Sequence, residues 1–326
     1  MSKNSIVELD YFVDLQPREE NFKEAVFKGL ALSQKAISPK FFYDSKGSEI
    51  FDKICTTSDY YVTQIEVALL NKIHKEIRTF IKSGSAIMEY GCGSSVKIRA
   101  LLSALPSPTH YIAIDISKAH LIATAKEVVA DYPNISVGAI CADFGEFIEW
   151  PKEVPIASSR RVAFFPGSTI GNQTPSEARE FLNKVRFAIG SEGLFLVGVD
   201  LKKNIEVLNR AYNDSMGYTA DFNSNLLYRM KKELNAELNM SKFSHDAFYN
   251  ETLGRVEMHL VSDVQQNIRI DDSVFSFKKG ESIHTENSYK YSIEEFIELA
   301  KNSGFATLKY WSDDNKYFGI FLMQAI

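Results

Sequence analysis

Between Ala86 and Asp200, short apolar runs alternate with segments that have helical spacing, and this pattern limits the fold more than any other feature of the chain. The apolar runs are nearly continuous, which is typical of strands buried on both faces of a sheet. The expected strands are residues 87–90, 110–117, 135–143, 161–167 and 194–200, and the expected helices are residues 95–104, 118–131, 145–150 and 175–189. The alternation predicts an α/β fold built on a parallel sheet.

The chain on either side of this block follows other patterns. Residues 65–82 indicate an amphipathic helix, and residues 289–326 indicate a capped helix followed by two antiparallel strands around an Asp-Asp-Asn turn. Residues 201–288 indicate an insertion with helices first and an alternating strand later, and residues 1–65 a polar, helical lead-in. We therefore expect one domain from residues 66–200 and 289–326, and a second from residues 1–65 and 201–288.

Composition argues against several classes of partner. The 326 residues carry a net charge of -5 with Lys and Arg scattered, so we expect no nucleic acid to bind. No apolar run approaches the ~18 residues of a membrane span, and no signal peptide is indicated, so we expect a cytoplasmic protein that binds no membrane. The three cysteines form no CxxC pair and the six histidines show no zinc-motif spacing, so we expect no metal.

The segment from Ala86 to Lys97 joins a strand, a glycine-rich bend and a helix. Gly91 lacks a Cβ, so the backbone there can approach a nucleotide-like ligand closely. Asp115 ends the next expected strand, where a carboxylate can accept both hydroxyls of a ribose, and Asp143 with Phe144 ends the third, where the pair can hold an adenine ring. Either acid alone is typical of a strand end or helix cap, but together they favour a site for an adenosyl ligand.

The glycine bend, the two acids and the C-terminal hairpin resemble the class I S-adenosylmethionine-dependent methyltransferases over residues 85–200 and 289–326. The resemblance implies a Rossmann-like sheet, with S-adenosylmethionine as methyl donor and S-adenosylhomocysteine as product. A hydride-transferring Rossmann enzyme is the competing interpretation, but the third glycine of its fingerprint is missing and the terminal hairpin argues against it.

Segments outside that core narrow the resemblance. They are similar to signature segments of the histidine Nα-methyltransferases of ergothioneine biosynthesis, and of relatives acting on other aromatic amino acids. The segments are FFYDSKGSEIFDKI, SDYYVTQIE, FFPGSTIGNQTP, LNRAYND, VEMHL and HTENSYKY. In that family the lead-in and the insertion form an α+β domain that holds the amino acid, and three successive transfers give the trimethylated betaine, hercynine.

The resemblance implies a role for individual residues. The positions that match donor-binding residues are Gly91, Lys97, Asp115, Asp143 and Phe144. The positions that match substrate-binding residues are Tyr43, Phe51, Tyr60, Gly167, Thr169, Asn172, Tyr212, Met258, Glu286 and Ser288. Among these, Asn172 and Tyr60 take the catalytic places beside the amine, and Tyr212 contacts the carboxylate. Glu286 and Ser288 read the imidazole, and Met258 forms a wall of its pocket.

These roles agree with the chemistry of methyl transfer to an amine, which needs a neutral nitrogen lone pair in line with the donor. The protein then contributes mostly orientation and desolvation. An amide such as Asn172 and a phenol such as Tyr60 can hold the amine without favouring its protonated form, and aromatic faces tolerate a trimethylammonium product. We expect a monomer that methylates L-histidine.

Two other interpretations are kept. The first is the same chemistry on another aromatic amino acid, such as tryptophan or a derivative, and the second is a non-catalytic protein that senses an adenosyl ligand. Glu286 by itself fits a solvated charge in a polar loop, and only the resemblance places it in a pocket. If residues 286–288 are extended, Asn287 should point away from Glu286 and Ser288, because side chains alternate along a strand.

Overall fold

The structure is a computed structural model that describes residues 8–17, 21–93 and 95–326. The chain forms two compact units. Unit 1 takes the described residues within 1–18, 65–201 and 291–326, and unit 2 takes those within 19–64 and 202–290.

Unit 1 is built on an eight-stranded sheet in the order β1-β5-β4-β3-β6-β7-β14-β13. The strands are β1 (Tyr11–Asp14), β3 (Ala86–Tyr90), β4 (His110–Asp115), β5 (Ser136–Cys141), β6 (Arg161–Phe165), β7 (Leu194–Asp200), β13 (Phe305–Ser312) and β14 (Phe318–Ala325). Neighbouring strands are parallel except where β14 meets β7 and β13. Strands β3 and β7 are buried along their whole length, as their apolar sequences require. The predicted α/β sheet with a terminal antiparallel hairpin is confirmed.

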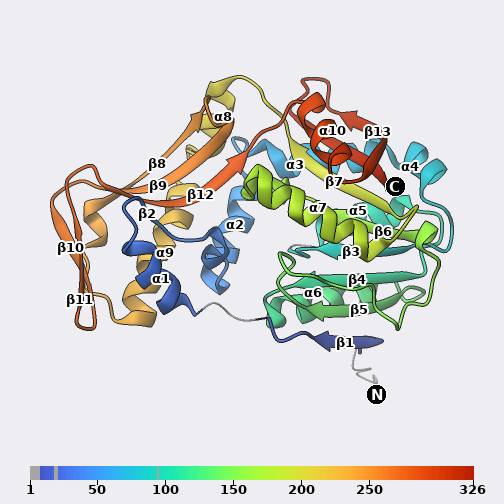
Figure 1. Ribbon diagram of the computed structural model, residues 1–326, viewed down its shortest axis with the longest axis horizontal. Helices are drawn as coiled ribbons and strands as arrows, with labels where there is room; N and C mark the ends of the chain where they lie inside the picture. The colour runs from blue at the N-terminus through green and yellow to red at the C-terminus, as the bar shows by residue number, and fades with distance from the viewer. Residues whose placement is uncertain (1–7, 18–20, 94) are drawn as a thin grey trace, which may run out of the picture. The chain divides into compact units, whose positions relative to one another are not determined.

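The helices of unit 1 cover both faces of this sheet. They are α3 (Tyr61–Lys72, mostly in this unit), α4 (His74–Phe80), α5 (Val96–Ala104), α6 (Lys118–Asp131), α7 (Pro175–Ile189) and α10 (Ile293–Lys301). The chain moves from β3 outward to β4 and β5, then returns to the other side of β3 with β6. Because such crossovers are right-handed, α5 and α6 lie on one face and α7 on the other, as Figure 1 shows. The reversal beside β3 creates the place where open α/β sheets bind ligands, at the carboxyl ends of the strands.

Two of the expected helices are wrong in detail. Residues 145–150 form no helix, because the Asp143 carboxyl accepts a hydrogen bond from Gly145 N at 2.8 Å in a local turn and Pro151 disfavours a helical residue before it. Residues 65–82 form two helices, α3 and α4, which are separated at Ile73.

The N-terminal residues also differ from the expectation that 1–65 form part of the second domain. Strand β1 pairs in parallel with β5, with Tyr11 opposite Gly138, so the described residues 8–17 belong to unit 1. A Cβ at position 138 would lie 1.9 Å from the Tyr11 ring, so only glycine leaves room for it. Helix α1 begins at Phe22, and residues 18–20 of the predicted lead-in helix lie outside the described residues.

Unit 2 contains a four-stranded sheet in the order β2-β12-β9-β8 and a separate hairpin, β10-β11. The strands are β2 (Lys35–Ala36), β8 (Phe243–Asn250), β9 (Arg255–Ser262), β10 (Gln266–Ile270), β11 (Ser273–Phe277) and β12 (Ser282–Tyr289). The helices are α1 (Phe22–Leu30), α2 (Ser45–Thr56), α8 (Ile205–Ala211) and α9 (Tyr218–Leu234), and α9 packs against α2 and the sheet. This mixture of helices with an antiparallel sheet is the α+β organisation expected of the second domain, although its bounds are 19–64 and 202–290.

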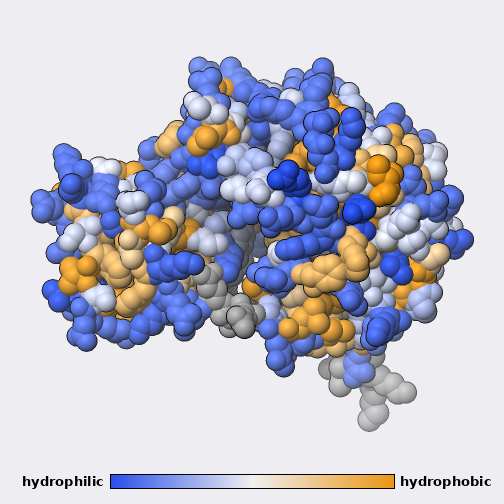
Figure 2. Space-filling view, viewed as in Figure 1, coloured by the Kyte–Doolittle hydropathy of each residue, from blue (hydrophilic) through white to orange (hydrophobic). Residues whose placement is uncertain are grey.

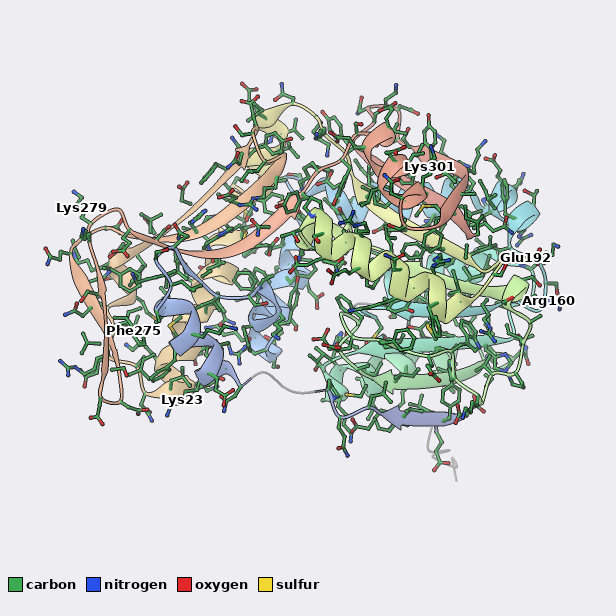
Figure 3. All side chains as sticks on the ribbon, viewed as in Figure 1. Lys23, Arg160, Glu192, Phe275, Lys279 and Lys301 are labelled. Carbon is green, nitrogen blue, oxygen red and sulfur yellow. The ribbon has the colours of Figure 1, made fainter. Side chains whose placement is uncertain are left out.

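Helix α1 packs against the β10-β11 hairpin. The rings of Phe27 and Phe275 meet edge to face with centroids 5.6 Å apart, and Lys23 forms an ion pair with Asp271 at 2.6 Å. Figure 3 labels Phe275 on β11 beside this helix. The aromatic contact and the charge pair give the hairpin a partner outside its own two strands, which an isolated hairpin needs for stability.

The surface in Figure 2 is largely hydrophilic, with hydrophobic residues gathered in separate patches. Within the described ranges, none of the helices has the length and apolar character needed to cross a membrane.

Candidate active site

In unit 1 the glycine bend lies at the carboxyl end of β3. Gly91 N donates to the Ile114 carbonyl at 2.9 Å, and Gly91 has a φ of +73°, which glycine adopts without strain. A Cβ at position 91 would lie 3.7 Å from the Phe144 ring, so the structure brings these two predicted donor residues together. Phe144 itself packs edge to face on Phe165, at a centroid distance of 5.5 Å.

The predicted ribose acid, Asp115, ends β4 beside the bend. Its Oδ1 accepts a hydrogen bond from Ser117 N at 2.9 Å, and its Oδ2 lies 3.9 Å from Cys92 Sγ. Burial raises the pKa of Asp115, which indicates that the carboxyl group is held away from water. Burial also raises the pKa of the Cys92 thiol, so Cys92 fills space in the bend rather than acting as a nucleophile.

Lys97 does not stand alone as a donor-binding cation. Its ammonium pairs with Glu66 at 2.9 Å, and both carboxylate oxygens of Glu66 accept from Gly167 N, at 3.0 and 2.9 Å. Glu66 is 1% exposed. The sequence reasoning missed Glu66, which ties the helix after the glycine bend to the loop after β6.

That loop carries the predicted substrate residues of unit 1. Gly167 has a φ of +81°, and Thr169 and Asn172 are the first and last residues of a single 3₁₀ turn. Ser168 is buried, and its Oγ accepts from Asp200 N at 2.9 Å. The hydroxyl of Ser168 therefore fixes the loop to the end of β7.

In unit 2, the predicted aromatic residues form one cluster. Tyr43 meets Phe51 edge to face at 5.6 Å, Phe51 meets Tyr60 at 6.2 Å, and Tyr60 meets Tyr212 at 6.3 Å between ring centroids. Phe222 of α9 packs on both Tyr43 and Phe51, at 5.5 and 5.8 Å. Phe222 was not predicted, and its position on an amphipathic helix gave no sign of a role beyond the core.

Tyr60 remains a phenol in this environment. Burial raises its pKa well above the ordinary value, and the nearby Tyr212, Cys55, Tyr43 and Glu286 raise it further. Tyr60 can therefore donate or accept a hydrogen bond at neutral pH without carrying a charge.

A β-bulge in β12 determines which way Glu286 and Ser288, the residues predicted to read the imidazole, point. Opposite β9, His284 pairs with His259 and Glu286 pairs with Met258, with the register shifted between the two pairs. Because directly paired residues share a face and neighbours alternate, His284 and Glu286 lie on opposite faces of the sheet. The extra residue is Thr285, so the bulge turns Glu286 onto the face of Met258.

The predicted alternation within residues 286–288 is confirmed. Asn287 pairs with Glu257, on the other face from the Glu286–Met258 pair, while Ser288 returns to the face of Glu286. Glu286 is half-buried, and burial raises its pKa to about 7, an effect that the nearby ammonium of Lys290 opposes. Lys290 is buried and is a second charged group that the sequence reasoning did not assign.

Polar groups behind the cluster hold the bulge in place. Asn223, fully buried on α9, accepts a hydrogen bond from Thr285 Oγ1 at 2.8 Å and donates to His245 Nδ1 at 2.8 Å. The other ring nitrogen of His245 lies 2.9 Å from the Tyr212 carbonyl, to which it donates. This network connects the bulge to the backbone of Tyr212.

The opposite face of β9 and β12 gathers Glu257, His259 and His284, whose possible ligand atoms lie within 4.8 Å of one another. This grouping was not apparent from histidine spacing, and it has the ligand count of a metal site. The rings of His259 and His284 stack at 4.6 Å with planes 13° apart, so their in-plane lone pairs run side by side rather than converging. Arg255 also pairs with Glu257 at 2.9 Å. The donor set therefore fits a metal ion poorly.

The structure thus collects the predicted residues in two groups. In unit 2, the aromatic cluster is joined to Ser288 because Tyr212 Oη donates to Ser288 Oγ at 2.7 Å, and Glu286 and Met258 share that face. In unit 1, the other predicted residues lie on the glycine bend, the first turn of α5, the ends of β4 and β5, and the loop after β6: Gly91, Lys97, Asp115, Asp143, Phe144, Gly167, Thr169 and Asn172. The roles of these residues remain predictions.

Comparison with known proteins adds independent evidence. A family model described as histidine-specific, SAM-dependent methyltransferase matches residues 22–325. A histidine N-alpha-methyltransferase of Mycobacterium tuberculosis is 34% identical over 302 residues, covering 91% of this chain and 92% of that protein. The corresponding protein of Mycolicibacterium smegmatis is 33% identical over 93% of this chain and 94% of its own length. A 4-dimethylallyltryptophan N-methyltransferase of Arthroderma benhamiae is 26% identical over 91% of each chain.

Proposed function

Because the chain belongs to the family of histidine-specific, S-adenosylmethionine-dependent methyltransferases, we propose that it methylates the α-nitrogen of L-histidine three times and releases the betaine hercynine. The observation that carries the choice of histidine is the pair Glu286 and Ser288 on one face of β12, beside the Met258 side chain. A carboxylate that accepts and a hydroxyl that can donate complement the N–H and the bare nitrogen of a neutral imidazole ring.

Unit 2 is proposed to hold the amino acid. Tyr212 lies on the carboxylate side of the amino acid with its hydroxyl proton donated to Ser288, and the Tyr43, Phe51 and Tyr60 rings surround the amine. Their faces tolerate the growing nitrogen substituents and the trimethylammonium product, because a ring quadrupole attracts a quaternary ammonium. The aromatic cluster therefore suits a reaction in which the product of each transfer becomes the next substrate.

The catalytic requirement on the protein is a neutral amine with a defined direction. Tyr60, kept as an uncharged phenol by burial, and the amide of Asn172 orient the nitrogen without stabilising the ammonium form. No oxyanion develops in this displacement. Orientation and exclusion of water therefore supply the acceleration, and effective molarities in favourable cases correspond to about 7–11 kcal/mol.

Unit 1 is proposed to bind the donor, which supplies a methyl group from its sulfonium. Gly91 has a left-handed backbone and no side chain, so its backbone is open to a ligand, and the Phe144 ring lies beside it. A bare backbone next to an aromatic ring fits a nucleoside. Asp115 accepts the ribose hydroxyls, and Asp143 with Phe144 binds the adenine. Lys97 binds the donor while it is paired with Glu66, whose carboxylate also accepts a hydrogen bond from Gly167 N.

Purified protein incubated with S-adenosylmethionine and histidine should give products heavier by one, two and three methyl groups, all on the α-nitrogen. Tryptophan and 4-dimethylallyltryptophan, offered in parallel, test the alternative that the likeness to the Arthroderma protein raises. A site that hydrogen-bonds two ring nitrogens discriminates against a side chain lacking them by ~10⁴ or more. Methylation of tryptophan at a rate equal to that of histidine, or binding of the donor without turnover, would contradict the proposal.

The Glu286→Ala variant directly tests the proposed role of Glu286 in recognising the imidazole ring. We expect its kcat/KM on histidine to fall at least 100-fold while that on tryptophan changes less than threefold. Met258→Leu, which keeps the volume and polarity of the neighbouring wall, is the matched control. Equal losses on both amino acids would remove the role of Glu286.

The protein is also proposed to act as a monomer in the cytoplasm, without a metal ion. The three cysteines, which form no disulfide, and the acidic net charge support the compartment. Light scattering of the purified chain tests the monomer, a fluorescent fusion tests the compartment, and full activity after dialysis against a chelator tests the metal.

A further inference from the structure

A buried triangle of polar groups lies at the end of β12. Lys290 Nζ is 2.9 Å from Tyr212 Oη and 2.7 Å from Ser288 Oγ, and the two oxygens are 2.7 Å apart. Lys290 is 2% exposed, Ser288 3% and Tyr212 7%. The ammonium also lies over the Tyr212 ring, 4.8 Å from its centroid. A charged lysine at this depth needs such partners, because burying an unpaired charge is expensive.

The direction of each hydrogen bond follows from the number of protons. An ammonium only donates, so Lys290 donates to both oxygens. Tyr212 Oη accepts from Lys290, and its single proton goes to Ser288 Oγ. Ser288 Oγ then accepts two hydrogen bonds, which fills both of its lone pairs, and keeps one proton of its own to donate.

We propose that Lys290 is a positioning residue that makes Ser288 a hydrogen-bond donor toward the substrate ring, so that the site selects the neutral imidazole of histidine. This inference rests on the proposed function. One ring nitrogen accepts from Ser288 Oγ, while the other carries the N–H that Glu286 accepts. An imidazolium presents two N–H groups and no acceptor, so its second proton would face the Ser288 proton.

The charges around the ring support the same selection. Lys290 lies near Glu286, where its ammonium favours the ionised carboxylate that must accept the N–H, against the effect of burial. Tyr60, before α3, lies near Glu286, and the His245 ring contacts the Tyr212 carbonyl. Burial raises the pKa of Tyr60 and lowers the pKa of His245, so both are neutral at physiological pH. Lys290 and Glu286 are therefore charged groups that act on the substrate ring.

A double-mutant cycle tests whether Lys290 acts through Ser288. We expect Lys290→Met to raise KM for histidine at least tenfold and to change kcat at saturation less than threefold. In the Ser288→Ala background the same substitution should raise KM less than twofold, because no hydroxyl proton remains to be directed. Costs that multiply in the double variant would overturn the proposal. Near-ultraviolet circular dichroism of each variant reports whether it is folded.

A second experiment needs no variant. Affinity of the wild-type protein for histidine and for 1,2,4-triazolylalanine is measured by calorimetry with S-adenosylhomocysteine at pH 8 and pH 5.5. The triazole ring remains neutral over this range, so its loss of affinity reports Glu286 alone, whereas the histidine ring becomes charged. We expect histidine to lose about threefold or more affinity beyond the loss seen for the triazole on acidification. Equal losses of affinity for the two ligands would show that the site does not discriminate by the charge of the ring. A wild-type protein that binds no histidine at either pH would instead refute the proposed function.

Discussion

Glu286 should destabilise the protein that contains it, and the size of the effect can be worked from its surroundings. Burial raises the pKa of Glu286 from the ordinary 4.5 to about 7. At about 1.4 kcal/mol for each pH unit, the ionised form costs the folded state at most about 3.5 kcal/mol. Because the side chain is half-buried, solvent screens part of this, and about 1–3 kcal/mol is expected.

The sign follows from proton binding. Below pH 4.5 both folded and unfolded chains carry the proton and there is no penalty. Between about 4.5 and 7 the folded chain keeps a proton that the unfolded chain loses, so the free energy of unfolding falls as pH rises. Glu286→Gln removes this dependence. It should therefore raise the melting temperature at pH 8 by about 2–4 °C per kcal/mol, with little change at pH 4.5.

Thermal unfolding of ligand-free protein, followed by calorimetry from pH 4.5 to 8, measures this difference. Glu281→Gln is the matched control near the start of β12. A hydrogen bond from Lys35 lowers the pKa of Glu281, so removing the Glu281 carboxylate should destabilise the folded protein at pH 8. A Glu286→Gln protein that is no more stable than wild type at pH 8, or equally stabilised at pH 4.5, would refute the reasoning.

Other parts of the molecule give further expectations. Asp115→Asn should weaken S-adenosylhomocysteine binding about 10- to 100-fold in calorimetry, because a charged acceptor for the ribose is lost; unchanged affinity would remove Asp115 from the donor site. Glu66→Gln should lower the free energy of urea unfolding by about 3 kcal/mol by leaving Lys97 buried without its partner, and adding Lys97→Met should recover part of it. Asn223→Ala should cost about 2 kcal/mol in unfolding and also lower kcat/KM for histidine, since His245 loses its Asn223 partner and the hydroxyl of Thr285 keeps only the Met258 carbonyl as acceptor; a stability loss without any kinetic change would show that the bulge does not depend on Asn223.

The central sheet was predictable because the residues of each strand indicate that strand without reference to distant parts of the chain. Buried parallel strands such as β3 and β7 need continuous apolar runs, and glycine or acidic residues end them. Strand β1 was not predictable, since four residues with an alternating pattern acquire their place only by pairing with a strand more than a hundred positions away. Gly138 within an apolar run was the available signal for that close approach.

Some residues of the candidate site could also be predicted from the sequence, and others could not. Glu66 was missed because the group it binds, Gly167 N, lies 101 positions along the chain. Lys290 could have been found, because Glu286, Ser288 and Lys290 alternate along one extended segment and so share a face. The grouping of His259 with His284 depends on strand register, which residue spacing alone does not reveal.

The bulge at Thr285 has a consequence for how this protein can change. If Thr285 were itself paired opposite Met258, as in a regular ladder, Glu286 would lie opposite Glu257, and Glu286 and Ser288 would turn to the face that now carries Asn287. The proposed choice of substrate therefore depends on strand register as well as on residue identity. A change that abolishes the bulge without removing a residue would disrupt the proposed imidazole recognition while leaving every recognition residue encoded, a kind of divergence that comparing aligned site residues alone would overlook.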